Sequence, residues 1–206
     1  VRESLVLLKN KSSTLPLNPG KRFLIIGEQS KFIENQMGGW TITWQGKTWE
    51  GTEISNKDFP NTLSIYESLS KHIIDSGGYV VTAYGKGEGD TKSLDFSSKN
   101  FAMINMMSSL SKKDIPIISL FITGRPLIVD KELNFSSAFV SIWHPGTAVE
   151  GINDVIFSNK DNSINYDFKG KLSFSWPSKI STNPLNISDT GYDPLFKFGY
   201  GLSYEN

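Results

Sequence analysis

The sequence contains no cysteine and only two histidines, His72 and His144. Without thiol groups the chain can form neither a disulfide bond nor a thiolate-ligated metal site. Two histidines also make a histidine-built metal centre unexpected, because zinc sites in proteins take three or four side-chain ligands. We therefore expect no metal and no cofactor.

Excess charge and long apolar runs are also lacking. Lys+Arg and Asp+Glu each number 21, so the formal net charge is zero, and this argues against a nucleic-acid partner. No apolar run is long enough to cross a bilayer, and no signal-peptide pattern opens the sequence. The 206 residues, 38% of them hydrophobic, are enough for a single domain over 1–206 with its own core.

The most unusual segment carries two tryptophans four residues apart. Trp40 and Trp44 lie in the glycine-bounded stretch 38–46, which follows an apolar strand predicted over 22–27. Tryptophan is usually buried in large part, so two of them in a polar loop need a physical reason. Either they pin the loop to the body of the domain, or they offer flat apolar faces to a ligand. A sugar ring suits such faces because it has an apolar C–H side and a rim of hydroxyl groups.

Hydrophobic periodicity predicts alternating helices and strands. Helices are predicted over 1–10, 63–74, 97–112 and 147–157, and strands over 22–27, 79–84, 116–122 and 138–143. This order predicts the α/β class, with a mostly parallel sheet flanked by helices in an α/β sandwich and a turn-rich C-terminal tail. Because the first predicted helix is already under way at residue 1, we expect the sequence to be part of a longer protein.

Four loops with unusual residues follow predicted strands. They are the segments 36–46, 85–90, 123–126 and 144–147. In open α/β sheets, ligands bind beyond the carboxyl ends of the strands. We therefore expect these loops to gather along one edge of the domain and to form its binding site.

Several segments, taken in order, resemble one known family. The most specific are GGWTITWQG at 38–46 and FGYGLSY at 198–204. The others are 2–10, 15–17, 124–126, 143–146, 170–177 and 192–196. Together they cover nearly the whole chain, which resembles the C-terminal α/β-sandwich domain of family 3 glycoside hydrolases, the β-glucosidase and exo-β-glucanase family.

The resemblance implies a function that is shared between two domains. Members of the family retain anomeric configuration by means of two carboxylates, and the nucleophilic Asp lies in a preceding N-terminal (β/α)8 barrel domain, which this chain does not contain. The double-tryptophan version resembles the branch that acts on β-glucans and cello-oligosaccharides. In that branch the present domain supplies one wall of the pocket and the acid/base Glu. The resemblance also favours a periplasmic or extracellular location.

The acid/base loop is where the sequence departs from the family pattern. A direct alignment of Tyr84 and Asp90 places Lys86 at the position of the glutamate, and lysine, with an ordinary pKa of about 10.4, is a poor proton donor near neutrality. The stretch from Thr62 to Asp90 is also short for the family. A second interpretation places a deletion or gap near residues 85–87 and leaves Glu88 as the acid/base candidate. A solvated loop carboxylate is the competing interpretation of Glu88.

The remaining candidates divide between binding and packing. The family places a sugar platform at the position of Trp44, so we expect Trp44 to bind substrate, whereas Trp40, the second substrate-binding candidate, is more simply a loop anchor. We expect His144 to be a packed turn residue and Arg125 to pair with an internal carboxylate or with carbonyl groups. We expect Trp143, Trp176 and the closing aromatic residues to pack in the core or against the barrel domain.

Two rival functions remain open. The first is a shortened, non-catalytic domain that has lost the acid/base residue and binds only glucan or a partner subunit. The second is a flavodoxin-like nucleotide binder. That function needs a phosphate-cradling loop after the first strand, and Gly27-Glu28-Gln29-Ser30 lacks the required glycine spacing.

Overall fold

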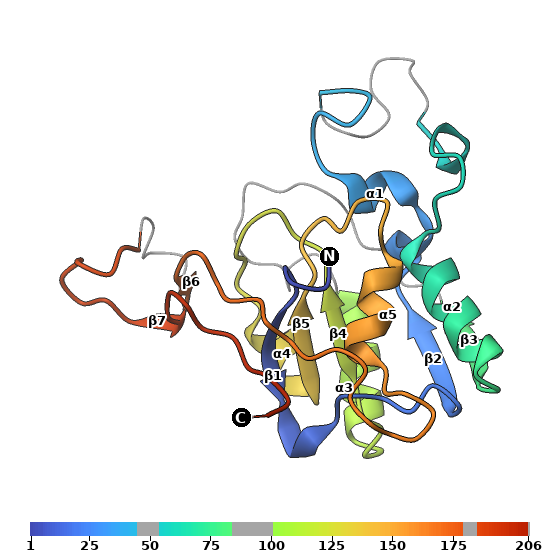
Figure 1. Ribbon diagram of the computed structural model, residues 1–206. Helices are drawn as coiled ribbons and strands as arrows, with labels where there is room; N and C mark the ends of the chain where they lie inside the picture. Colours follow the sequence, from blue (N-terminus) through green and yellow to red (C-terminus); the bar gives the residue numbers. More distant parts are fainter. Residues whose placement is uncertain (45–53, 84–100, 179–184, 206) are drawn as a thin grey trace.

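The computed structural model describes residues 1–44, 54–83, 101–178 and 185–205, which form a mixed α/β fold (Figure 1). In the described part of the chain, three strands form a central sheet in the order β1-β5-β4, β2 and β3 form a second sheet, and β6 and β7 form a short ribbon. The strands are β1 (Val6–Asn10), β2 (Arg22–Ile26), β3 (Tyr79–Ala83), β4 (Ile118–Phe121), β5 (Ala138–Ser141), β6 (Trp176–Pro177) and β7 (Pro194–Phe196).

Helices lie between several of these strands along the chain. They are α1 (Ile33–Met37), α2 (Ile65–Asp75), α3 (Phe101–Ser111), α4 (Asp130–Phe135) and α5 (Glu150–Ile156), with short 3-10 segments η1 (Lys11–Ser13), η2 (Glu28–Lys31) and η3 (Asn56–Asp58). The start of α2 is fixed by a capping box, in which the Ser64 hydroxyl accepts from the Glu67 amide and the Glu67 carboxylate accepts from the Ser64 amide. The predicted α/β class is confirmed.

Strand direction is mixed in the described residues. β2 pairs with β3 in parallel, and β4 pairs with β5 in parallel. β1 runs antiparallel to β5, and the ribbon β6–β7 is antiparallel. The parallel strands therefore carry the helical crossovers, while the antiparallel pairs involve the start and the tail of the chain.

The predicted helix over 1–10 is wrong, because Val6–Asn10 forms strand β1. The spacing of Val1, Leu5 and Leu8 fits one face of a helix, but all four residues from Leu5 to Leu8 are buried, with at most 2% of each side chain exposed. Such a continuous apolar run is typical of a strand that is covered on both faces. Strand β1 pairs with β5, with Val6 opposite Ser141 and Leu7 opposite Val140.

Alternate residues of the central sheet enter two separate hydrophobic cores. Leu7 of β1 and Val140 of β5 pack into the core that also contains residues of α2 and α5. Val6 and Phe139, their neighbours along the two strands, pack on the opposite face with Trp176 of the tail. This alternation is the period of two expected of strands, and it buries the sheet from both sides.

The C-terminal tail is part of the packed structure. The Leu202 amide donates to the Leu7 carbonyl of β1 over 2.9 Å, and the Trp176 indole N–H donates to the Leu127 carbonyl over 2.7 Å. At Gly170 an added Cβ atom would lie 2.2 Å from the Leu5 carbonyl oxygen. Glycine is therefore required at Gly170 for the tail to approach the backbone before β1.

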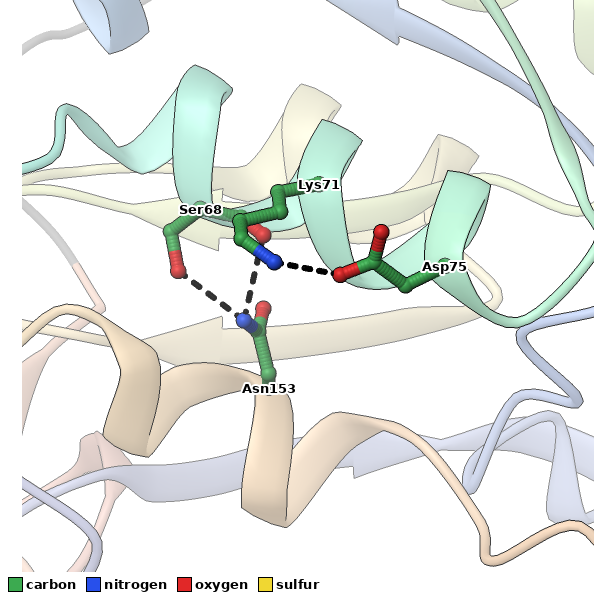
Figure 2. Close-up of polar contacts among 4 residues, drawn as sticks. All are labelled: Ser68, Lys71, Asp75 and Asn153. Carbon is green, nitrogen blue, oxygen red and sulfur yellow. Dashed lines mark hydrogen bonds and ion pairs between the residues drawn. The ribbon is translucent and has the colours of Figure 1, made fainter.

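A buried amide joins α5 to α2. The Asn153 side chain donates to the Ser68 carbonyl over 3.2 Å and to the Ser68 hydroxyl over 2.9 Å, as Figure 2 shows. On the outer side of α2, Lys71 forms an exposed ion pair with Asp75 one turn later. The buried contact fixes how the two helices pack, whereas an exposed pair of this kind contributes little to stability.

The packing of His72 predicts a pH dependence of stability. Its ring stacks on Phe157 with 4.9 Å between ring centroids. Burial lowers the pKa of His72 below its usual value, and Lys71 adds to this, while Asp154 and Asp75 oppose it. The unfolded chain therefore takes up the proton first, so the free energy of unfolding should fall as the pH drops below about 6.5.

We expect the urea midpoint of the wild type to decrease between pH 7 and pH 5, and the His72→Phe variant to lose part of this decrease. An unchanged slope in His72→Phe would contradict the assignment.

Candidate functional site

Three of the four predicted loops meet at one edge of the domain. The His144 ring, which follows β5, lies against Gly38 after α1 and against Gly124 after β4. An added Cβ atom would lie 3.4 Å from His144 Cγ at Gly38 and 3.2 Å from His144 Nε2 at Gly124. The imidazole thus occupies a slot that two glycines leave open. The predicted grouping of loops is confirmed for these three.

The fourth loop, 85–90, lies outside the described residues, and with it Lys86, Glu88 and Asp90. Strand β3 ends at Ala83, which pairs with Ile26 at the end of the parallel strand β2. Because β2 leads into the tryptophan-bearing segment, β3 ends at the same edge. The roles of Glu88 and Lys86 stay predictions.

The loop 38–44 is closed on itself by backbone hydrogen bonds. The Trp40 amide donates to the Trp44 carbonyl over 3.0 Å, and the Thr43 amide donates to the Thr41 carbonyl over 2.7 Å. Trp40 and Ile42 adopt positive φ angles of 64° and 63°, a conformation that is unfavourable for bulky side chains. Backbone strain of this kind concentrates at functional sites, where the surrounding structure imposes it.

Both tryptophan side chains of this loop point to solvent. Trp40 is 81% exposed and Trp44 is 62% exposed. Their ring centroids lie 6.4 Å apart with the planes inclined by 50°, so neither ring covers the other face to face. The prediction that Trp40 anchors the loop to the body of the domain is therefore wrong. Ile42 between them is also 60% exposed, and an apolar patch of this kind marks an interaction site.

The tryptophans predicted to pack are buried in whole or in part. Trp176 is fully buried. Trp143 is half-buried, donates from its indole N–H to the Ser4 carbonyl over 2.8 Å and meets Phe174 edge-on at 5.6 Å between centroids. These contacts confirm a packing role and separate this pair from the exposed pair, Trp40 and Trp44.

Two further candidates lie at the loop edge. His144 is exposed, but its ring packs between two glycines, in agreement with a packed turn residue. Arg125 is exposed, and its backbone N–H and carbonyl both bond to the Thr123 hydroxyl. The predicted pairing of the Arg125 side chain stays a prediction.

Sequence reasoning missed Gln36, a deeply buried polar side chain next to these loops, with 1% exposed. It lies in α1, two residues before Gly38, and its side chain bonds to three backbone groups. In the sequence it stands in the polar run Glu34-Asn35-Gln36, which carries no signal of burial.

Neither a metal-binding cluster nor a membrane-spanning helix is found in residues 1–44, 54–83, 101–178 and 185–205. Within those ranges no group of three or more His, Asp or Glu side chains could hold a metal ion. In the same part of the chain, no helix has both the length and the apolar character to cross a membrane.

Comparison with known families gives one match over nearly the entire chain. The model of the glycosyl hydrolase family 3 C-terminal domain matches residues 5–204. This range contains all of the loops described above.

Two curated relatives match nearly all of this chain and are themselves longer proteins. The chain is 25% identical to a periplasmic β-glucosidase of Salmonella typhimurium, over 98% of this chain and 34% of the relative. It is 28% identical to a lysosomal β-glucosidase of Dictyostelium discoideum, over 98% of this chain and 28% of the relative. The chain thus spans about a third of the length of these relatives.

Solved structures of a glucanase and a β-glucosidase are also similar to this chain. A crystal structure of a mutant exo-1,3/1,4-β-glucanase from Pseudoalteromonas sp. is 38% identical, with a TM-score of 0.86, over 98% of this chain and 35% of that one. A β-glucosidase from Listeria innocua in complex with glucose has a TM-score of 0.72 over 97% of this chain and 32% of that one; at 18% identity it supports the fold alone.

The contrast between exposed and buried tryptophans predicts separate effects on stability. Trp44→Ala should change the free energy of unfolding by less than about 0.5 kcal/mol, because the ring has few contacts to lose. Trp176→Ala should cost about 3–5 kcal/mol, because it removes a fully buried indole. Denaturant titrations of the two variants measure both values. A large loss in Trp44→Ala would mean that Trp44 packs rather than presents its ring.

Proposed function

Because the chain belongs to the glycosyl hydrolase family 3 C-terminal domain family, we propose that it forms one wall of the sugar-binding pocket of a retaining β-glucosidase. The whole enzyme hydrolyses terminal β-D-glucosyl residues of glucans or oligosaccharides. The observation that carries this proposal is the pair of exposed rings, Trp40 and Trp44, on a closed loop at the strand-end edge.

The physical fit to a sugar rests on the two aromatic faces. A pyranose ring stacks its C–H side on an aromatic face and leaves its hydroxyl rim for polar groups. Because the two rings are inclined by 50°, each keeps a face for such contact. The aromatic rings supply area with few rotatable bonds, so little conformational entropy is lost on binding. Similarity to an exo-1,3/1,4-β-glucanase supports a β-glucan or cello-oligosaccharide as the substrate.

The chemistry requires a second domain. In retaining hydrolysis a carboxylate attacks the anomeric carbon while a carboxylic acid donates its proton to the departing oxygen. The same acid, now a carboxylate, then takes a proton from the water that releases the sugar. We assign the nucleophile to an N-terminal (β/α)8 barrel domain and the acid/base role to Glu88. The position of β3, which ends at the tryptophan edge, supports Glu88.

The alternative is a non-catalytic glucan- or partner-binding domain. Lys86 in place of the expected glutamate favours it. The alignment with the Salmonella enzyme also runs over 265 residues, whereas this chain has 206, so parts of the relative have no counterpart here. If the acid/base loop is among the lost parts, the tryptophan platform remains but the proton donor does not.

The platform is tested by Trp44→Ala in the protein that carries the barrel domain. We expect KM for a cello-oligosaccharide to rise on the order of tenfold, which corresponds to about 1.4 kcal/mol of binding free energy. Phe198→Ala removes another exposed aromatic, 56% exposed in the tail, and should leave KM unchanged. Equal KM values for wild type and Trp44→Ala would mean that Trp44 does not bind the substrate.

The acid/base role is tested by Glu88→Gln in the same protein. For a substrate with a poor leaving group, we expect kcat/KM to fall by about 10²–10⁴-fold, because no proton reaches the departing oxygen. A dinitrophenyl β-glucoside needs no such proton, so its cleavage to the glycosyl-enzyme should persist.

Lys86→Gln is the matched control for Glu88→Gln, since it alters a charge in the same loop, and it should retain activity. Wild-type inactivity on both substrates, together with glucan-dependent quenching of tryptophan fluorescence, would favour the non-catalytic alternative.

A further inference from the structure

Gln36 is a polar side chain in the buried interior, where a polar group without hydrogen-bond partners destabilises the fold. It lies in α1 (Ile33–Met37) and is 1% exposed. Burying an amide without partners costs several kcal/mol on the order-of-magnitude scale of transfer energies. A buried amide is therefore retained where its hydrogen bonds do something that an apolar side chain cannot do.

The side chain of Gln36 joins three segments that are distant in sequence. Its Nε2 donates to the Leu63 carbonyl over 2.9 Å and to the Gly146 carbonyl over 3.1 Å. Its Oε1 accepts from the Ile65 amide over 3.1 Å. Both amide hydrogens and the oxygen are thus used, and all three partners belong to the backbone.

These three bonds join α1, which leads into the tryptophan loop, to two other elements of the domain. Leu63 and Ile65 lie at the start of α2, and Gly146 lies in the turn between β5 and α5. The Gly146 amide also donates to the Gln36 carbonyl over 2.9 Å. Gln36 and this turn are therefore joined in both directions. Figure 1 shows α1 next to the start of α5 and above α2.

The tryptophan loop begins immediately after this junction. Gly38, two residues beyond Gln36, adopts a φ of 93° and lies against the His144 ring. The loop then closes through the bond from the Trp40 amide to the Trp44 carbonyl. The start of the tryptophan loop is thus held by Gln36, and the loop is closed by its own backbone hydrogen bond. Both tryptophan rings remain exposed.

We propose that Gln36 is a positioning residue that holds the Trp44-bearing loop in place for sugar binding. This inference rests on the function proposed above. Gln36 does not itself face the substrate. It acts through α1, which it locks to the β5–α5 turn and to the start of α2, so that Trp44 presents its ring in one place instead of several.

Only an amide of this length fits the three partners. A carboxylate has no hydrogen to offer the Leu63 and Gly146 carbonyls, and a methionine leaves all three backbone groups without their partner. Gln36→Met keeps the volume and removes the bonds. Gln36→Glu keeps the volume and still accepts from the Ile65 amide. When the glutamate is protonated, its O–H can donate to one of the two carbonyls, Leu63 or Gly146, but not to both.

The control is a second buried amide that touches α2 but not the tryptophan loop. Asn153 is 5% exposed and makes two hydrogen bonds to Ser68. Asn153→Leu removes these bonds at nearly equal volume. It should lower stability about as much as Gln36→Met does, while the loop keeps its position.

The experiment is a double-mutant cycle in the protein that carries the barrel domain, with a cello-oligosaccharide as substrate. We expect Gln36→Met to raise KM on the order of tenfold and Asn153→Leu to leave KM within about twofold, at similar losses in thermal midpoint. In the Trp44→Ala background, Gln36→Met should raise KM no further, because the residue it positions is already gone. Gln36→Glu should fall between the wild type and Gln36→Met.

The outcomes separate this inference from the function it rests on. If Trp44→Ala raises KM but Gln36→Met does not, or if their effects on KM simply multiply, the positioning role is wrong and the platform stands. If Trp44→Ala itself leaves KM unchanged, the platform fails first. Should Gln36→Met not fold, Gln36→Glu takes its place in the cycle, and an unchanged KM in that variant would also overturn the role.

Discussion

The burial of the central sheet on both faces is the constraint on which the rest of the structure depends. Every residue from Leu5 to Leu8 and from Ala138 to Ser141 is at most 2% exposed. Strands covered on two sides do not accommodate charged side chains along their buried length. Unusual residues can therefore accumulate only where the strands end, and in this chain they do so at the edge that carries His144 and the tryptophan loop.

At that edge, glycines and backbone hydrogen bonds do the positioning. Gly38 and Gly124 leave the slot that the His144 ring fills, and the closed loop 38–44 turns Trp40 and Trp44 outward. The buried amide of Gln36 connects the loop to the framework. The exposed aromatic area is thus carried by a short segment whose start is held from inside the domain, which suits the sugar-binding role proposed for it.

Elements with strong periodicity could be predicted from the sequence. The strands β2, β3, β4 and β5 and the helices α2 and α5 lie where the apolar patterns place them. The first segment is a strand because it is buried on both sides, although Val1, Leu5 and Leu8 match a helical face. The short helix α4 was missed because Asp130–Phe135 is too brief to show a period. The outward direction of the Trp40 side chain could not be predicted, because local sequence does not determine which way a loop residue points.

The sequence by itself determined the α/β class, the family and the position of the tryptophan loop, because these depend on local periodicity and on motifs that stand in a fixed order. Tertiary structure alone decided that β1 joins the central sheet, that both tryptophans face solvent and that His144 lies between Gly38 and Gly124. The burial of Gln36 belongs to the same group. Its partners are 27 residues away at Leu63, 29 at Ile65 and 110 at Gly146, and contacts over such separations leave no trace in a local pattern.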